Sequence, residues 1–143
     1  MRLVDVNVLV YGFRQDAPDH RSYAAWLKRL VNADEAYGVS DLILSGFLRI
    51  VTHPRIFTPP TPMPAALAFA QAFRSAPSAV FVAPGPRHWE IFARLCREAD
   101  ARGNLVPDTW LAALAIESGS EFMTTDGDYA RFPGLRWSHP LKG

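Results

Sequence analysis

The chain has 143 residues, enough for one domain with a buried core, and it carries a formal net charge of only +1. Its composition, 49% apolar and 20% charged, excludes a mainly disordered chain, and its charge excludes a polycationic nucleic-acid coat. Cys96 is the only cysteine and the four histidines are scattered, which excludes an internal disulfide and a zinc cluster. Any anion that the chain binds must therefore contact a local patch.

Neither a secretory signal nor a membrane span is predicted. Asp5 interrupts the N-terminal apolar run at once, and no run approaches the roughly 18 apolar residues that a membrane span needs. A single thiol suits a reducing compartment. We therefore expect a cytoplasmic protein that does not insert into membranes.

Short apolar runs alternate with helical patterns along the whole chain. The runs predict buried strands at 2–4, 37–39, 79–82 and 122–124, and a weaker pattern allows a fifth at 135–137. A helical turn follows the first strand, then a loop over 12–18. Helices are predicted at 20–31 after the cap Asp19, at 41–51 after the cap Ser40, around 67–73, and at 87–101 ended by Gly103. A last helix is predicted at 107–118, with Pro107 in its first turn and Gly119 at its end. The proline-rich segment 53–64 is predicted to be irregular.

This alternation predicts an α/β fold in which a short central parallel sheet of four to five strands is covered by helices on both faces. We expect a three-layer α/β/α arrangement, with residues 1–143 forming a single domain.

Polar residues cluster where the predicted strands end, which is where open parallel sheets place their sites. Asp5 is the most informative of them, because an acid between Val4 and Val6 would be buried at a real cost without a partner or a cation. Asp108 also fits an ordinary helix first turn, and Asp126 and Asp128 also fit an ordinary turn. The polar residues after the strands are Asp5, Asn7, Ser40, Asp41, Thr124, Thr125, Asp126 and Asp128, and Asp108 opens the late helix.

Carboxylates that converge without a cysteine or histidine cluster indicate a hard cation, Mg²⁺ or Mn²⁺. Such a cation suits the hydrolysis of phosphodiester bonds, because it activates water and neutralises charge on the phosphate.

Four segments make the chain resemble the PIN-domain ribonucleases, and among them the VapC toxins of type II toxin–antitoxin systems. They are residues 4–9 (VDVNVL), 103–108 (GNLVPD), 124–129 (TTDGDY) and 131–137 (RFPGLRW). The resemblance implies a PIN-like fold and a Mg²⁺-dependent endoribonuclease, with Mn²⁺ as a substitute. It also implies an RNA substrate, a homodimer, and a VapB-type antitoxin whose C-terminal segment lies over the active site.

The resemblance assigns roles to individual residues. It implies that Asp5, Asp108 and Asp126 are catalytic metal ligands, that Asp128 is an accessory catalytic acid, and that Asn7 and Thr125 orient the carboxylates. Two further residues are predicted to bind RNA from their places near the acidic site, Arg14 after the first strand and Arg131 just beyond Asp128.

One position departs from the family pattern. Gly46 stands where the family usually has a glutamate, and Asp41 does not replace it because five residues turn a helix so that the two positions point about 140° apart. One alternative is therefore a catalytically weak or inactive PIN-fold module that binds RNA or a protein partner. An aspartyl phosphatase is a third reading, but Asn7 holds the place where its acid–base aspartate would be needed.

Overall fold

The computed structural model describes residues 1–142 and contains one five-stranded sheet in which every neighbouring pair is parallel. The strand order is β3-β2-β1-β4-β5, so β1 lies in the centre. The strands are β1 (Arg2–Val4), β2 (Tyr37–Val39), β3 (Ala79–Phe81), β4 (Glu121–Met123) and β5 (Trp137–Ser138). The predicted parallel sheet is confirmed, with the fifth strand slightly later than expected; residue 143 of the predicted domain lies outside the described residues.

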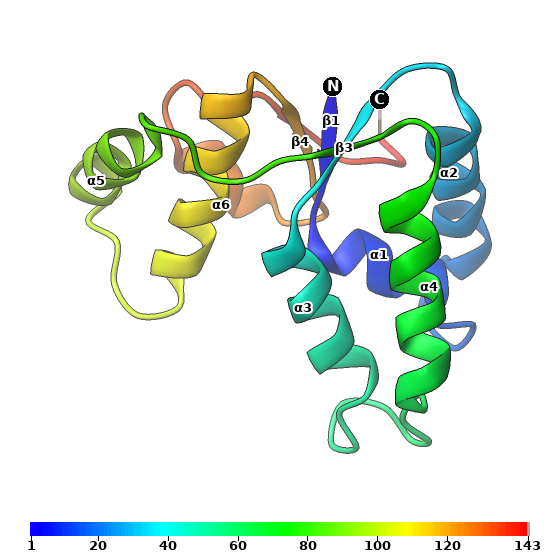
Figure 1. The fold of residues 1–143 in the computed structure, drawn as a ribbon. Coiled ribbons are helices and arrows are strands. Elements are labelled where there is room, and N and C mark those ends of the chain that lie inside the picture. The colour runs from blue at the N-terminus through cyan, green and yellow to red at the C-terminus, as the bar shows by residue number, and fades with distance from the viewer. Residues whose placement is uncertain (143) are drawn as a thin grey trace.

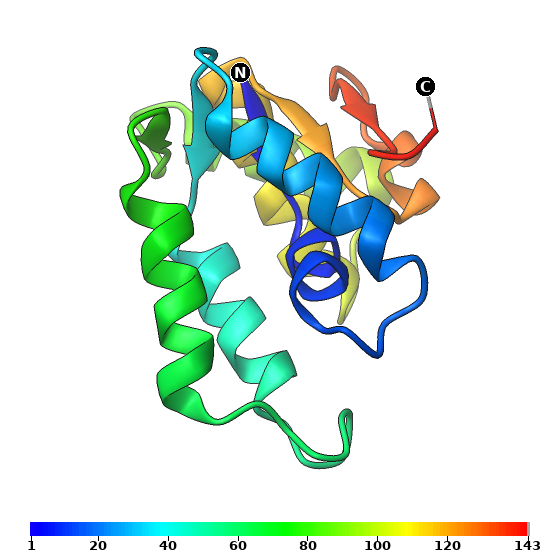
Figure 2. The same ribbon diagram turned by 90° about the vertical axis from the view of Figure 1, so that its right-hand side faces the viewer.

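Helices cover both faces of this sheet, which confirms the predicted α/β/α layers (Figure 1). On one side the helices are α1 (Val6–Phe13), α2 (His20–Asn32), α3 (Asp41–Val51) and α4 (Met63–Ser75), and on the other they are α5 (His88–Ala99) and α6 (Leu105–Ser118). Figure 2, turned by 90°, shows α2 lying in front of the central strands, with α4 (green) to the left of it. A short 3-10 helix, η1 (Gly127–Arg131), joins β4 to β5. No helix of residues 1–142 is long and apolar enough to cross a membrane.

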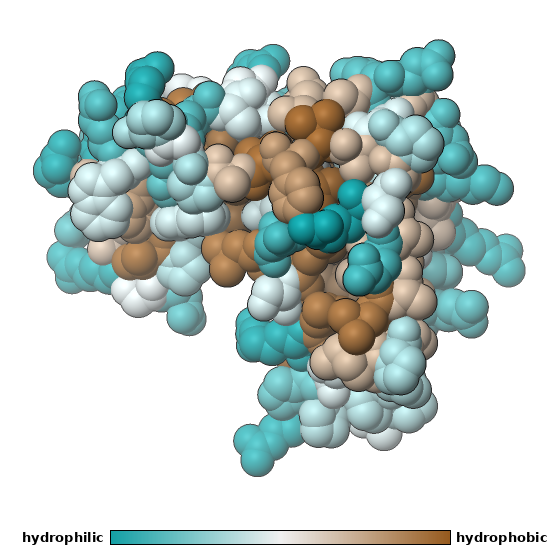
Figure 3. Space-filling model, in the orientation of Figure 1, coloured by the Kyte–Doolittle hydropathy of each residue, from teal (hydrophilic) through white to brown (hydrophobic). Residues whose placement is uncertain are grey.

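The topology creates a crevice between β1 and β4. The chain passes from β1 to β2 and β3 through the helices of one face, then returns to β4 through α5 and α6 on the other. Connections that leave adjacent strands on opposite faces open a crevice at the carboxyl ends of those strands. In the space-filling view the surface is recessed between the α5–α6 side and the α3–α4 side (Figure 3).

The segment after β1 is a full helix, longer than the predicted turn. Asp5 caps it by accepting a hydrogen bond from the Val6 amide, and its apolar side chains at positions 8–10 are buried. Burial outweighs the low helix propensity of its valines. Gly12 fits inside this helix because Leu27 of α2 packs directly against it, leaving no room for a Cβ.

Three aromatic rings fix α3 against α1. Phe13, Phe47 and Phe69 pack together with ring centroids 4.9–5.4 Å apart, and they join α1, α3 and α4. The α3–α4 pair is thereby held at a defined place beside the end of β1.

Two of the predicted helix boundaries need correction. Ser40 caps α3 as predicted, by accepting from the Ile43 amide at 3.5 Å. Asp19 precedes α2 but makes no side-chain cap, because its backbone is left-handed with φ 57°. Helix α5 ends before Asp100, also left-handed with φ 49°, and not at Gly103.

Candidate active site

Asp5 lies at the carboxyl end of the central strand and is 7% exposed. Its two oxygens accept different hydrogen bonds, Oδ1 from the Val6 amide and Oδ2 from the Thr124 hydroxyl, each at 2.7 Å. Within residues 1–142 it forms no ion pair. Burial raises the pKa of Asp5 from 3.8 to about 6, the two hydrogen bonds oppose that rise, and the carboxylates of Asp108 and Asp126 add to it.

Thr124, at the end of β4, connects two of the carboxylates. Its hydroxyl donates to Asp5 and accepts a bond from the Asp126 amide at 3.1 Å. The predicted orienting role of Thr125 is corrected to Thr124, because successive side chains of an extended chain point to opposite sides. Neither Asn7 nor Thr125 donates a side-chain hydrogen bond to a carboxylate among residues 1–142.

Asp108 reaches the same crevice from the first turn of α6, where it is partly buried. The Tyr129 hydroxyl donates a hydrogen bond to Asp108 Oδ1 at 3.2 Å. Burial is the largest cause of the raised pKa of Asp108; Asp126 and Asp128 raise it further, whereas Tyr129 and Arg131 lower it. Sequence patterns gave no role to Tyr129, since its hydroxyl meets a residue 21 positions away.

The remaining acids lie on the turn after β4. Asp126 caps η1, with Oδ1 accepting from the Asp128 amide at 2.9 Å. Asp128 is exposed, and its carboxylate lies 3.7 Å from the guanidinium of Arg131. Arg131 also donates from Nε to the Asp128 carbonyl at 3.1 Å, and its contact with RNA stays a prediction.

The predicted carboxylates therefore share one rim. Hydrogen bonds link the segments that carry three of them: the Thr124 hydroxyl joins Asp5 to the Asp126 amide, and Tyr129, three residues after Asp126, donates to Asp108. Their oxygens suit a hard cation such as Mg²⁺, and Asp5 would be its most buried ligand. Among residues 1–142 no group of three or more histidine, cysteine or acidic side chains is already arranged as a metal site.

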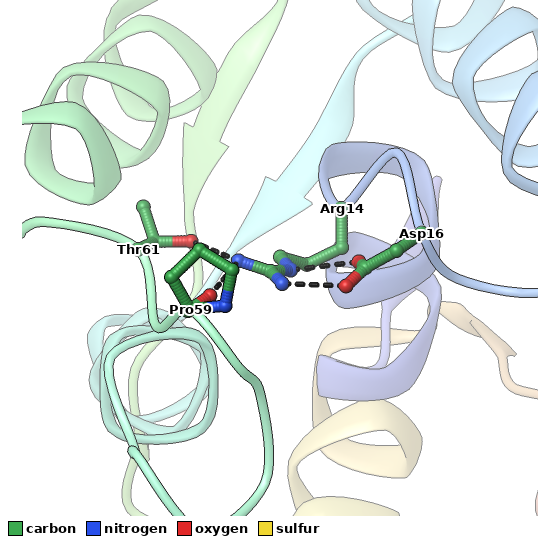
Figure 4. Close-up of polar contacts among 4 residues, drawn as sticks. All are labelled: Arg14, Asp16, Pro59 and Thr61. Carbon is green, nitrogen blue, oxygen red and sulfur yellow. Dashed lines mark hydrogen bonds and ion pairs between the residues drawn. The ribbon is translucent and has the colours of Figure 1, made fainter.

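The structure does not support Arg14 as an RNA contact. The residue ends α1, and its guanidinium is bound on every side (Figure 4). It pairs with both oxygens of Asp16 at 2.9 and 2.6 Å, donates to the Pro59 carbonyl and the Thr61 hydroxyl, and stacks on Phe57. With its side chain 11% exposed, Arg14 fastens the proline-rich loop to α1 and has no free face for a phosphate.

Gly46 faces the start of α1, directly after Asp5. A Cβ at this position would lie 3.1 Å from Val6 Cγ2, so Val6 partly fills the space that a larger side chain would need. Asp41 points elsewhere, as predicted, and pairs with Arg74 at 2.9 and 3.3 Å.

Comparison with known proteins identifies the family of this chain. The sequence profile of the PIN domain matches residues 2–135. Ribonuclease VapC43 of Mycobacterium tuberculosis is 46% identical over 143 residues, covering 100% of this chain and 97% of its own. Ribonuclease VapC25 of the same organism is 42% identical over 140 residues, covering 98% of this chain and 99% of its own.

The chain therefore belongs to the PIN domain family, and within it to the VapC ribonucleases. Solved structures agree in fold. VapBC2 of Rickettsia felis, bound to a promoter DNA fragment, superposes with a TM-score of 0.70 at 18% identity, over 96% of this chain and 97% of that one. VapC20 of Mycobacterium tuberculosis, described as a sarcin-ricin loop cleaving toxin, gives 0.64 at 16% identity, over 95% and 99%.

Proposed function

We propose that this protein is a Mg²⁺-dependent endoribonuclease and the toxin of a VapBC-type pair, with Mn²⁺ able to replace Mg²⁺. The observation that carries this proposal is Asp5, a buried carboxylate without an ion pair in residues 1–142, whose pKa is raised by burial and by two neighbouring carboxylates. A divalent cation would offset the cost of ionising it.

Asp5, Asp108 and Asp126 would hold the cation. When bound, it would supply an activated water and offset negative charge on the phosphate. Thr124 and the Val6 amide fix both oxygens of Asp5, so its carboxylate keeps one orientation. Asp128 is exposed at the rim, where it can accept a proton as an accessory acid–base group.

The substrate is RNA, in keeping with the ribonuclease names of the relatives. A net charge of +1 gives no broad electropositive surface, so binding rests on few phosphate contacts. Arg131 is the arginine placed for one, since its side chain is 43% exposed beside Asp108. RNA presented as a loop or a single strand suits such a small contact area.

The partners follow the relatives. The similar solved structures include VapBC complexes, and we extend that pairing to this chain as a VapB-type antitoxin. A homodimer and a cytoplasmic location belong to the same proposal.

The direct test is cleavage of a labelled hairpin RNA by the wild-type protein and Asp5→Asn, with Mg²⁺, with Mn²⁺ and with a chelator. We expect cleavage only by the wild-type protein and only with metal. Asp41→Asn is the matched control, since it removes an equal charge outside the site and should leave cleavage unchanged. Cleavage by folded Asp5→Asn would refute the mechanism. Wild-type protein that binds RNA but never cuts it, even with Mn²⁺, would support the binding-only alternative raised by Gly46.

A further inference from the structure

We propose that Tyr129 is a positioning residue for catalysis, whose hydroxyl holds the Asp108 carboxylate in the orientation that binds the cation. This inference rests on the proposed function and concerns how one ligand is kept in place. Asp108 is carried by α6, whereas Tyr129 is carried by η1 after β4, so their contact joins the elements that precede and follow this strand.

The tyrosine ring is held rigidly. Tyr129 is 2% exposed, and its ring packs against Phe122 of β4 and Phe132, with centroids 4.7 and 5.7 Å away. A ring packed on both of these neighbours has little freedom to change rotamer. Its hydroxyl therefore presents a fixed donor, 3.2 Å from Asp108 Oδ1.

The Tyr129 hydroxyl is the donor in this hydrogen bond. A phenol has an ordinary pKa of about 10 and keeps its proton at neutral pH. It must then donate, because an ionised carboxylate only accepts. The bond uses one oxygen of Asp108 and leaves the other available to a metal ion.

The turn that carries Tyr129 also carries Asp126. The Tyr129 amide donates to the Asp126 carbonyl at 3.3 Å, and residues three apart in a 3-10 helix lie one above the other. One short turn thus places Asp126 at the rim and aims a donor at Asp108. Hydrogen-bond partners of metal ligands commonly change metal affinity or activity by 10- to 100-fold when removed.

Tyr37 provides a matched control for a purely structural role. It is also buried, and its hydroxyl donates to a main-chain carbonyl, that of Phe73 on α4. Tyr37→Phe and Tyr129→Phe therefore remove the same atom from a buried hydrogen bond, and only the second bond reaches an active-site acid.

The test is Mn²⁺ titration calorimetry on the full chain, with RNA cleavage measured in parallel. We expect Tyr129→Phe to bind Mn²⁺ roughly tenfold more weakly and to lower kcat with little change in the KM for RNA, whereas Tyr37→Phe matches the wild-type protein in both. In an Asp108→Asn background the change at Tyr129 should have no further effect on Mn²⁺ affinity.

Equal Mn²⁺ affinity in the wild-type protein and Tyr129→Phe would overturn this inference alone, as would an equal loss in Tyr37→Phe. Failure of the wild-type protein to bind Mn²⁺ would overturn the proposed function and this inference with it.

Discussion

Replacing Asp5 by asparagine should stabilise the fold near neutral pH and not at acid pH. The pKa of Asp5 is raised from 3.8 in the unfolded chain to about 6 in the fold. Between these values the folded chain binds the proton more tightly than the unfolded chain, so the wild-type protein loses stability as the pH rises through this window. Above about pH 6 the fold carries the full cost of an ionised, buried carboxylate, and asparagine removes that cost.

The size of the effect follows from the same pKa values. A rise from 3.8 to about 6, at 1.36 kcal/mol for each tenfold change in proton affinity, corresponds to about 3 kcal/mol. Asparagine has one acceptor oxygen for two donors, the Val6 amide and the Thr124 hydroxyl, so losing one bond costs about 1–2 kcal/mol. The net gain is about 1–2 kcal/mol at about pH 8, or roughly 3–6 °C in Tm, and at about pH 4 the variant is the less stable protein.

The assay is urea unfolding of both proteins between about pH 4 and pH 8 in the presence of a chelator. Asp41→Asn again serves as the control. The hydrogen bond from Arg74 lowers the pKa of Asp41, so this exposed carboxylate stabilises the fold at pH values above its unfolded pKa. The Asp41→Asn variant should therefore not gain stability relative to the wild-type protein as the pH rises. An Asp5→Asn protein less stable than the wild type at about pH 8 would refute the reasoning, as would a stability difference that stays constant with pH.

Three further outcomes are expected. Arg14→Lys should lower the free energy of unfolding, measured with urea, by about 1–2 kcal/mol, because lysine lacks the planar guanidinium that fastens the proline-rich loop. The same variant should bind RNA with unchanged affinity. Arg131→Ala should weaken RNA binding and reduce the slope of log K against log salt by about 0.7; an unchanged slope would exclude this phosphate contact. The double variant Gly46→Glu with Val6→Ala should bind Mn²⁺ roughly tenfold more tightly than Val6→Ala alone. Val6→Ala makes room for the glutamate, and the added carboxylate raises the negative charge of the metal site. Equal Mn²⁺ affinities of the two variants in calorimetry would show that position 46 does not face the metal.

Local patterns in the sequence were enough to define the architecture. Strand and helix periods are properties of short segments, and their alternation leaves few arrangements other than a parallel sheet between helices. The common rim of Asp5, Asp108 and Asp126 follows from this topology, because the ends of parallel strands and the starts of the next helices meet at one edge. The cap at Ser40 was equally predictable, since it depends on residues three positions apart.

Side-chain direction and distant contacts depended on the tertiary structure. Whether Thr124 or Thr125 contacts Asp5 depends on where β4 ends. A shift of one residue along a strand moves a side chain to the opposite face of the sheet. Arg14 looked free because its partners at Pro59 and Thr61 lie more than 40 residues away.

The same reason applies to the two features of the site that no sequence pattern predicted. Tyr129 meets Asp108 only because folding brings η1 and the start of α6 together, although the two residues are 21 positions apart. Val6 crowds Gly46 only because aromatic packing presses α3 against α1. A local sequence pattern fixes the backbone path over a few residues, whereas the partner of a side chain is decided by the close packing of segments that are distant along the chain.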